Sequence, residues 1–428
     1  MADSLPVTVP TGGLIQTPDR PSSIVARGLM DVGLALSQPG TDAEGLFQRG
    51  MAHLDKGQPD ASCEFFLAAA KLGHAEAQLL THEFSYNSSR DHFSDANQQA
   101  MHWLEESVST GFGPAQRYLA IEFQGGDEGW PRRRLLLEQA TEWYELRAAA
   151  GDLDAQKALA MMHWKEEAPH ATRAKAFHWM TAAAEQDNPH AMVTLGYWYL
   201  WDDPTKQGAD QSIYWYSKAA QLGDSWACQK LGDLFLFGHG GSRSDVRADR
   251  ALSQIFPPNP IEAVSWYTRR FELGNALGAF TLGKLYLEGV YIGQDLQVAE
   301  QWLLTAAKAG STDAERLLGC EYATGERFER NLGAAIVYLT PSAERGFVDI
   351  QYRLAKVYED REAEKREARD YTLAYKWYYL TAQTDKKVYA PIRNKAAAVL
   401  SALSTKMEPG QCAEAQRLAR EWTNDYAP

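Results

Sequence analysis

The sequence predicts an all-α protein, a right-handed α/α solenoid of about nine helix pairs with a C-terminal helical cap. Three observations carry this prediction. An aromatic side chain stands eight positions before a glycine or an aspartate, this spacing returns nine times, and four of the eight intervals between successive turn residues are 36 residues long. Repetition at such a period is typical of arrays in which each helix pair packs mainly on its neighbours.

In each pair, an aromatic residue of the second helix stands eight positions before the turn residue that ends this helix. Glycine is expected at the turn because it adopts a positive φ without steric cost, and aspartate tolerates that conformation moderately well. The pairs are Phe65/Gly73, Trp103/Gly111, Trp143/Gly151, Trp179/Asp187, Trp215/Gly223, Trp266/Gly274, Trp302/Gly310, Tyr338/Gly346 and Trp377/Asp385.

The first helix of each pair has a signature of its own. Alanine is followed by leucine at +4, glycine or alanine at +5 and an aromatic residue at +8, as in AMVTLGYWY, residues 191–199. A glycine inside a helix costs about 1 kcal/mol relative to alanine, so we expect close helix packing to offset it. The glycines are Gly196, Gly232, Gly283 and Gly319, and Ala120, Ala160 and Ala355 occupy the same position.

A helix pair of 36 residues with LG in its first helix and IYWYSKAAQLG (residues 213–223) in its second resembles the Sel1-like repeat family, within the tetratricopeptide-like superhelices. The resemblance covers roughly residues 41 to 385. It implies a non-enzymatic scaffold or adaptor that binds a polypeptide on the concave face of the array.

The chain is expected to have three parts. Residues 1–40 form a flexible leader with one possible helix, and residues 386–428 form two capping helices, the second beginning near Pro409. Pro341 is expected to kink or break its helix, and about fifteen extra residues within 238–260 are expected to form a mobile excursion or a contact loop. Between leader and cap lies the array 41–385, with repeats at 41–73, 74–111, 112–151, 152–187, 188–223, 224–274, 275–310, 311–346 and 347–385.

Composition narrows the function classes. The 428 residues include 43 basic and 56 acidic side chains, and a net charge of −13 without a basic stripe argues against nucleic acid. No signal peptide and no apolar run of membrane-spanning length is evident, so no membrane partner is expected. Four scattered cysteines without a CxxC motif predict reduced thiols and a cytoplasmic protein. A monomer is the simplest expectation.

Motifs for chemistry are missing from the sequence. There is no GxSxG nucleophile elbow, phosphate-binding loop or HExxH helix, so we expect neither an enzyme nor a cofactor. The histidines at 74, 82, 92 and 102 lack the i, i+4 spacing that places two ligands on one helical face. No metal site is expected.

Two functions remain open. The first is the scaffold, and the alternative is an immunity-type or inhibitory partner of a secreted bacterial toxin. Helical spacing turns positions +2 and +6 of the first helices away from the core, and these positions can either contact a partner or pack between repeats. The candidate partner-binding residues are Tyr197, Asp233, Phe280, Lys284, Tyr352 and Lys356.

Overall fold

The computed structural model describes residues 42–88, 95–122, 130–203, 205–238, 257–364 and 371–426. The leader 1–40 and most of the 238–260 insertion lie outside these residues. Within the described ranges every regular element is a helix, which confirms the predicted all-α class. The helices form two compact units that divide between Leu195 and Gly196, inside helix α10 (Pro189–Asp202).

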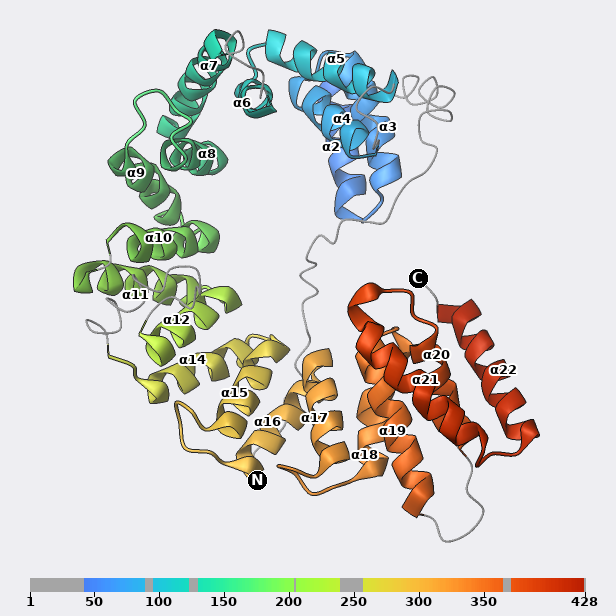
Figure 1. Cartoon of the computed structure of the whole chain (residues 1–428). Helices are drawn as coiled ribbons and strands as arrows, with labels where there is room; N and C mark the ends of the chain where they lie inside the picture. Colours follow the sequence, from blue (N-terminus) through green and yellow to red (C-terminus); the bar gives the residue numbers. More distant parts are fainter. Residues whose placement is uncertain are drawn as a thin grey trace. The chain divides into compact units, whose positions relative to one another are not determined.

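In the N-terminal unit the helices follow one another in pairs, and successive helices pack together (Figure 1). Helix starts are set by side chains that accept a hydrogen bond from the first turn, as Asp152 does from the amides of Asp154 and Ala155. The pairs are α2 (Ala43–Asp55) with α3 (Pro59–Lys71), α4 (Ala75–Ser88) with α5 (Asp95–Ser109), α6 (Gly113–Glu122) with α7 (Trp130–Ala149), and α8 (Leu153–Trp164) with α9 (Arg173–Ala184).

The C-terminal unit continues the pattern. Asn275, Asp295, Ser311 and Asn331 cap four of its helices in the same way. After α10 come α11 (Lys206–Gln221), α12 (Ser225–Phe237), α14 (Pro260–Glu272), α15 (Ala276–Glu288), α16 (Leu296–Lys308), α17 (Thr312–Thr324), α18 (Leu332–Glu344), α19 (Val348–Glu364), α20 (Thr372–Ala382), a 3-10 turn η1 (Lys387–Tyr389), α21 (Ala390–Ser404) and α22 (Pro409–Tyr426).

The turn residues adopt the expected backbone, with one exception. All seven glycines of the pattern have φ between 80° and 91°, and Asp187 takes their place with φ 57°. Asp385 does not adopt a positive φ, so the prediction of a left-handed turn there was wrong. Helix α20 already ends at Ala382, and Gln383 caps it with φ −87°, so the chain has left the helix before it reaches Asp385.

The residue after the recurring aromatic is buried in every second helix. Trp215 and Trp377 are themselves buried, but most of the other aromatics are half-exposed. Their neighbours fill the space between the two helices of a pair, and none is more than 7% exposed. These neighbours are Phe66, Leu104, Tyr144, Met180, Tyr216, Tyr267, Leu303, Leu339 and Tyr378.

Close packing at the mid-helix glycines is confirmed. A Cβ atom on Gly196 would lie 2.7 Å from a ring carbon of Tyr216, and one on Gly319 would lie 2.6 Å from Cγ of Leu339. Contacts this short are too close for a Cβ atom, so the second helix uses the space that glycine leaves. Alanines at the matching position of other repeats, such as Ala160, are fully buried.

Of the kink or break expected at Pro341, the break does not occur, because helix α18 continues through this residue. Proline removes the amide that would donate to the carbonyl of Val337. The side chain of Val337 is 67% exposed, which places this turn of the helix at the surface. Water can therefore satisfy the carbonyl that the proline leaves without a donor.

Helices α21 and α22 cover the last repeat. α22 begins at Pro409, as predicted, and its Ala415 and Ala419 are fully buried. The ring of Trp422 meets that of Trp377 edge-on, at a centroid distance of 6.2 Å. These two helices therefore shield the apolar side of α20 that would otherwise face water.

Candidate functional site

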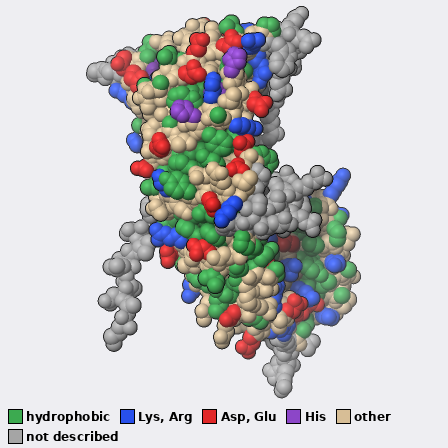
Figure 2. Space-filling view, turned by 90° about the vertical axis from the view of Figure 1, so that its left-hand side faces the viewer, with side chains coloured by type: hydrophobic (Ala, Val, Ile, Leu, Met, Phe, Trp, Pro, Cys, Tyr) green, Lys and Arg blue, Asp and Glu red, His purple; other side chains and the backbone are tan. Residues whose placement is uncertain are grey.

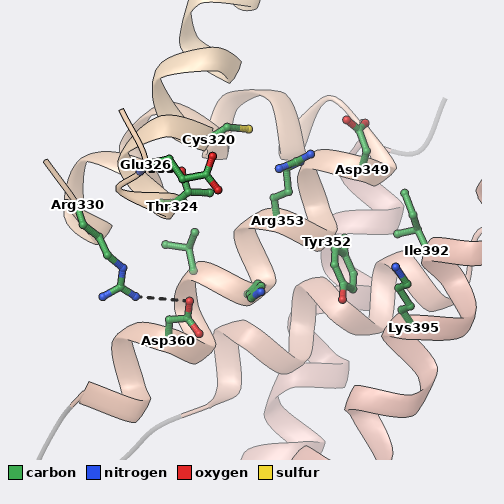
Figure 3. A pocket seen from close by; sticks show the side chains of 13 residues that line it. Cys320, Thr324, Glu326, Arg330, Asp349, Tyr352, Arg353, Asp360, Ile392 and Lys395 are labelled. Atoms are coloured by element: carbon green, nitrogen blue, oxygen red, sulfur yellow. Dashed lines mark hydrogen bonds and ion pairs between the residues drawn. The ribbon is translucent and has the colours of Figure 1, made fainter. Parts of the chain in front are cut away.

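A groove of about 580 Å³ lies between α17, α19 and α21, each the first helix of its pair (Figure 3). It combines charged side chains with a smaller number of apolar ones. Its lining residues are Cys320, Ala323 and Thr324 of α17, Glu326 and Arg330 of the following connection, Asp349, Tyr352, Arg353, Lys356, Val357 and Asp360 of α19, and Ile392 and Lys395 of α21. We call this feature the first-helix groove.

Two of the six predicted partner-binding residues, Tyr352 and Lys356, line the first-helix groove. They are one helical turn apart on α19. Tyr352 is half-buried, and its ring meets that of Tyr378 at 5.5 Å and 67°. Tyr378 is buried, and its hydroxyl donates to Glu359 at 2.9 Å. Packing from α20 therefore holds the Tyr352 ring in place, while Lys356 is exposed.

The acidic side chains of the groove are largely paired. Asp360 lies 3.6 Å from Arg330, the ion pair drawn in Figure 3, and Asp349 lies 3.8 Å from Arg316. The basic side chains Arg353, Lys356 and Lys395 are all exposed. Within the described residues these three cations and the exposed carboxylate of Glu326 form no ion pair, so the unpaired groups of the groove carry a smaller net excess of positive charge.

The thiol of Cys320 lines the first-helix groove as a neutral group. Burial raises the pKa of its thiol, and the nearby carboxylates Glu321 and Asp349 add to this effect while Arg353 opposes it. A thiol with a raised pKa stays protonated at neutral pH. The sulfur therefore adds apolar surface and no negative charge to the groove.

Sequence reasoning missed most of the residues that line the groove, among them Arg353, Ile392 and Lys395. Arg353 follows Tyr352 directly, but it falls outside the +2 and +6 positions. Ile392 and Lys395 belong to α21, which carries no repeat signature and was expected only to shield the array. No signal within α21 distinguishes a groove wall from a cap, because both require an amphipathic helix.

The structure places Tyr197, Phe280 and Lys284 outside the groove. Tyr197 of α10 is 46% exposed and stacks on Trp201 at 6.2 Å. On α15, Phe280 is half-buried against the core of the unit, and Lys284 is exposed with Glu288 at 3.6 Å. Tyr197 and Lys284 are therefore exposed to solvent, whereas Phe280 is only partly exposed.

Asp233 of α12 has internal partners. Its carboxylate accepts hydrogen bonds from the Tyr267 hydroxyl at 2.9 Å and the Gln229 amide at 2.6 Å. Arg270 donates to the other end of Gln229 and is itself buried. Burial raises the pKa of Asp233, and the two hydrogen bonds oppose this rise. The four side chains join α12 to α14.

Two of the four histidines of the second repeat, for which no metal site was expected, contact backbone or carboxylate oxygens. His74 lies 3.1 Å from Glu44, and His82 donates to the carbonyl of Ala100 at 3.0 Å. His92 lies outside the described residues. In the described part of the chain no group of three or more histidines, cysteines or carboxylates is arranged to hold a metal ion.

The N-terminal unit has a smaller hollow of about 300 Å³, beside the loop that joins α8 to α9. Glu166 and His170 of this loop have positive φ, and Glu167 forms an ion pair with Arg117 at 2.9 Å. In the ranges that the structure covers, no helix is both long and apolar enough to span a bilayer. Figure 2 shows acidic and basic side chains interspersed among hydrophobic ones on one face, without a continuous stripe of either sign.

Comparison with known proteins identifies the repeat. The family model described as Sel1 repeat matches eight segments that together span well over half of the chain. The first two helix pairs, α2 to α5, precede the matched region. The matched residues are 113–152, 153–188, 189–224, 227–248, 254–275, 276–311, 312–347 and 349–383.

Individual relatives are distant. The chain is 24% identical over 313 residues to the chitin synthase regulator SKT5 of Saccharomyces cerevisiae, covering 71% of this chain and 42% of that protein. It spans less than half the length of the curated relatives it matches.

Solved structures resemble the chain at a similar level. A Sel1 repeat protein from Oxalobacter formigenes is 20% identical over 89% of this chain and 97% of its own, with a TM-score of 0.41. The immunity protein PA5088 from Pseudomonas aeruginosa is 15% identical over 56% of this chain and 85% of its own, with a TM-score of 0.34.

Proposed function

The chain belongs to the Sel1 repeat family, and we propose that it is a non-catalytic scaffold that binds a polypeptide in the first-helix groove. Sel1 repeat proteins are generally scaffolds for protein interactions. We also propose that the protein is located in the cytoplasm, where its four free cysteines would stay reduced.

One observation carries the proposal. Three successive first helices contribute to the same groove, and Tyr352 and Lys356 occupy its middle helix. The groove spans three helices, and surfaces shared by neighbouring repeats of an array suit an extended or helical segment of another chain. Tyrosine held rigidly by packing suits this role, because little conformational entropy is lost when it contacts a partner.

The other four candidate residues lie outside the groove and have different roles. Tyr197 and Lys284 are exposed and are proposed as contacts outside the groove. Phe280 and Asp233 already pack or bond within the unit, so a partner contact would come in addition to these roles. Tyr352 and Lys356 are therefore the two candidate residues expected to contact the partner in the groove.

Site-specific crosslinking tests the proposal. A photoreactive phenylalanine analogue at position 356 should crosslink a polypeptide when the full chain is exposed to an extract of its native host. The same analogue at position 337 is the control, because Val337 is exposed on the second helix α18, which does not line the groove. The adduct at 356 should disappear when Tyr352 is also changed to alanine.

Equal adducts at both positions, or none at 356, would contradict a partner in the groove. The identity of a crosslinked polypeptide then separates a scaffold from an inhibitory partner of a secreted bacterial toxin. Circular dichroism and melting of each variant show that a lost adduct does not come from unfolding.

A further inference from the structure

The charge of the first-helix groove is opposite to that of the chain. The whole protein has a net charge of −13, yet the exposed charged side chains of the groove that form no ion pair within the described residues are the three cations Arg353, Lys356 and Lys395 and one carboxylate, Glu326. The negative charges of Asp349 and Asp360 are partly neutralised by Arg316 and Arg330. The groove is therefore a local basic site on an acidic protein.

Local charge decides what such a site binds. At physiological ionic strength the interaction between exposed charges is screened beyond about 8 Å. A ligand in the groove therefore responds mainly to the three nearby cations and to the single unpaired carboxylate of Glu326, and only weakly to the acidic residues outside the groove. Charges arranged in this way favour partners with complementary charge and speed their association.

Apolar side chains lie beside these cations. Val357 and Ile392 line the groove together with the packed ring of Tyr352, and the neutral thiol of Cys320 does not repel an anion. A small apolar area next to several cations is suited to a segment in which carboxylates flank an apolar or aromatic side chain. A nucleic acid needs a longer basic track for its phosphates than three side chains provide.

We propose that the first-helix groove binds an acidic segment of the partner polypeptide. Carboxylates of the segment contact Lys356, Lys395 and Arg353, and one apolar or aromatic side chain of the segment packs against Tyr352 and Ile392. This inference rests on the proposed scaffold function and specifies the chemistry of its partner. It also gives α21 a part in binding, because Lys395 and Ile392 belong to that helix.

Selection from a random dodecapeptide library displayed on phage tests this chemistry with the full chain as bait. The peptides enriched on the natural protein should be rich in aspartate and glutamate around one apolar residue. Their affinity should fall at least tenfold for the double variant Lys356→Glu and Lys395→Glu, and it should fall steeply as NaCl is raised. The milder variant Lys356→Ala with Lys395→Ala should show a smaller loss in the same direction, and it carries the test if the charge reversal impairs folding.

The matched control is the double variant Lys308→Glu and Lys406→Glu. Both lysines are exposed and lie outside the groove, so the net charge changes by the same amount. This control should keep the affinity for the selected peptides. An equal loss in both variants would show that total charge, and not the groove, governs binding, and would overturn the inference.

Three other outcomes also overturn it. The first is a set of selected peptides without acidic enrichment. The second is displacement of these peptides by a single-stranded dT oligonucleotide at equal charge concentration. The third is a sedimentation result in which a second copy of the chain fills the groove. The crosslinking experiment separates this inference from the scaffold function. A crosslinked polypeptide whose contact segment is not acidic would leave the scaffold in place and reject the acidic segment, whereas no polypeptide at position 356 would reject both.

Discussion

Gly232 of α12 lies directly against the ring of Tyr267 of α14: a Cβ atom on the glycine would be 2.5 Å from Cε1 of the tyrosine. Tyr267 is 1% exposed, so its ring has no room to move away. Both residues belong to one helix pair, and the same contact recurs between Gly196 and Tyr216.

Gly232→Ala should therefore lower the free energy of unfolding by about 1–3 kcal/mol through overpacking, although alanine is the better helix former by about 1 kcal/mol. Gly333→Ala is the control, because a Cβ at that exposed position of α18 would meet only Asn331 at 3.4 Å. The control should be neutral or stabilising. Urea unfolding of both variants measures the difference, and a stabilised Gly232→Ala would contradict the packing role of the glycine.

Trp215→Ala should cost about 3–5 kcal/mol of stability, as large-to-small changes in a core usually do. Trp215 is 6% exposed, whereas Trp226, on the following helix α12, is 52% exposed. Trp226→Ala should cost less than about 1 kcal/mol, including its contact with Lys230. Amide hydrogen exchange should show lost protection in α11 and α12 for the first variant alone, and similar exchange in both variants would place Trp215 outside the core.

Asp233→Ala should cost about 1–3 kcal/mol, because it leaves the buried hydroxyl of Tyr267 and the amide of Gln229 without their acceptor. Lys284→Ala should change stability by no more than about 0.5 kcal/mol, since Lys284 is exposed and its one ion pair among the described residues is with Glu288 at the surface. Thermal melting compares the two. An Asp233→Ala variant as stable as the natural protein would show that these hydrogen bonds contribute little.

Stability should fall as the pH drops below about 6.5, in part through His163. This side chain is 1% exposed, neither ring nitrogen has a hydrogen-bond partner in the described residues, and burial, then Lys175, lower its pKa. Between the unfolded and the lower folded pKa, the unfolded chain binds a proton that the folded chain does not, so acid favours unfolding by up to about 1.4 kcal/mol per pH unit.

His163→Phe should reduce this dependence. Position 163 corresponds to the +8 position of the first helix, which holds an aromatic ring in other repeats, such as Tyr199. Chemical denaturation of both proteins from pH 7 to pH 5 gives the two slopes. Parallel curves would mean that His163 titrates normally in the folded protein.

The repeat period was enough to predict the helix pairs and their turns, because glycine at positive φ and a small residue inside a helix both have local physical causes. It did not tell which of two adjacent aromatic residues is buried. Trp266 and Tyr267 lie about 100° apart around the helix, and the apolar face is at least that wide. Only the neighbouring Gly232 decides that Tyr267 fills the space.

Only part of the candidate site could be predicted from the sequence, for a similar reason. Tyr352 and Lys356 follow from helical spacing, but Lys395 and Ile392 reach the groove through the packing of α21 beside α19, which no repeat signature encodes. Asp233 occupies an outward position by spacing, yet the position of Tyr267 gives its carboxylate an internal partner. Pairwise contacts between helices, and not the period, account for these differences.

The contact between a mid-helix glycine and a bulky side chain has a consequence for how such proteins change in length. Gly283 and Leu303, like Gly319 and Leu339, each lie within a single helix pair. Copying or deleting one stretch of 36 residues therefore transfers or removes both partners of the contact together. Tandem duplication in a gene would thus extend the array by a pair that is already matched internally, and only its outer surfaces would need to adapt to the new neighbours.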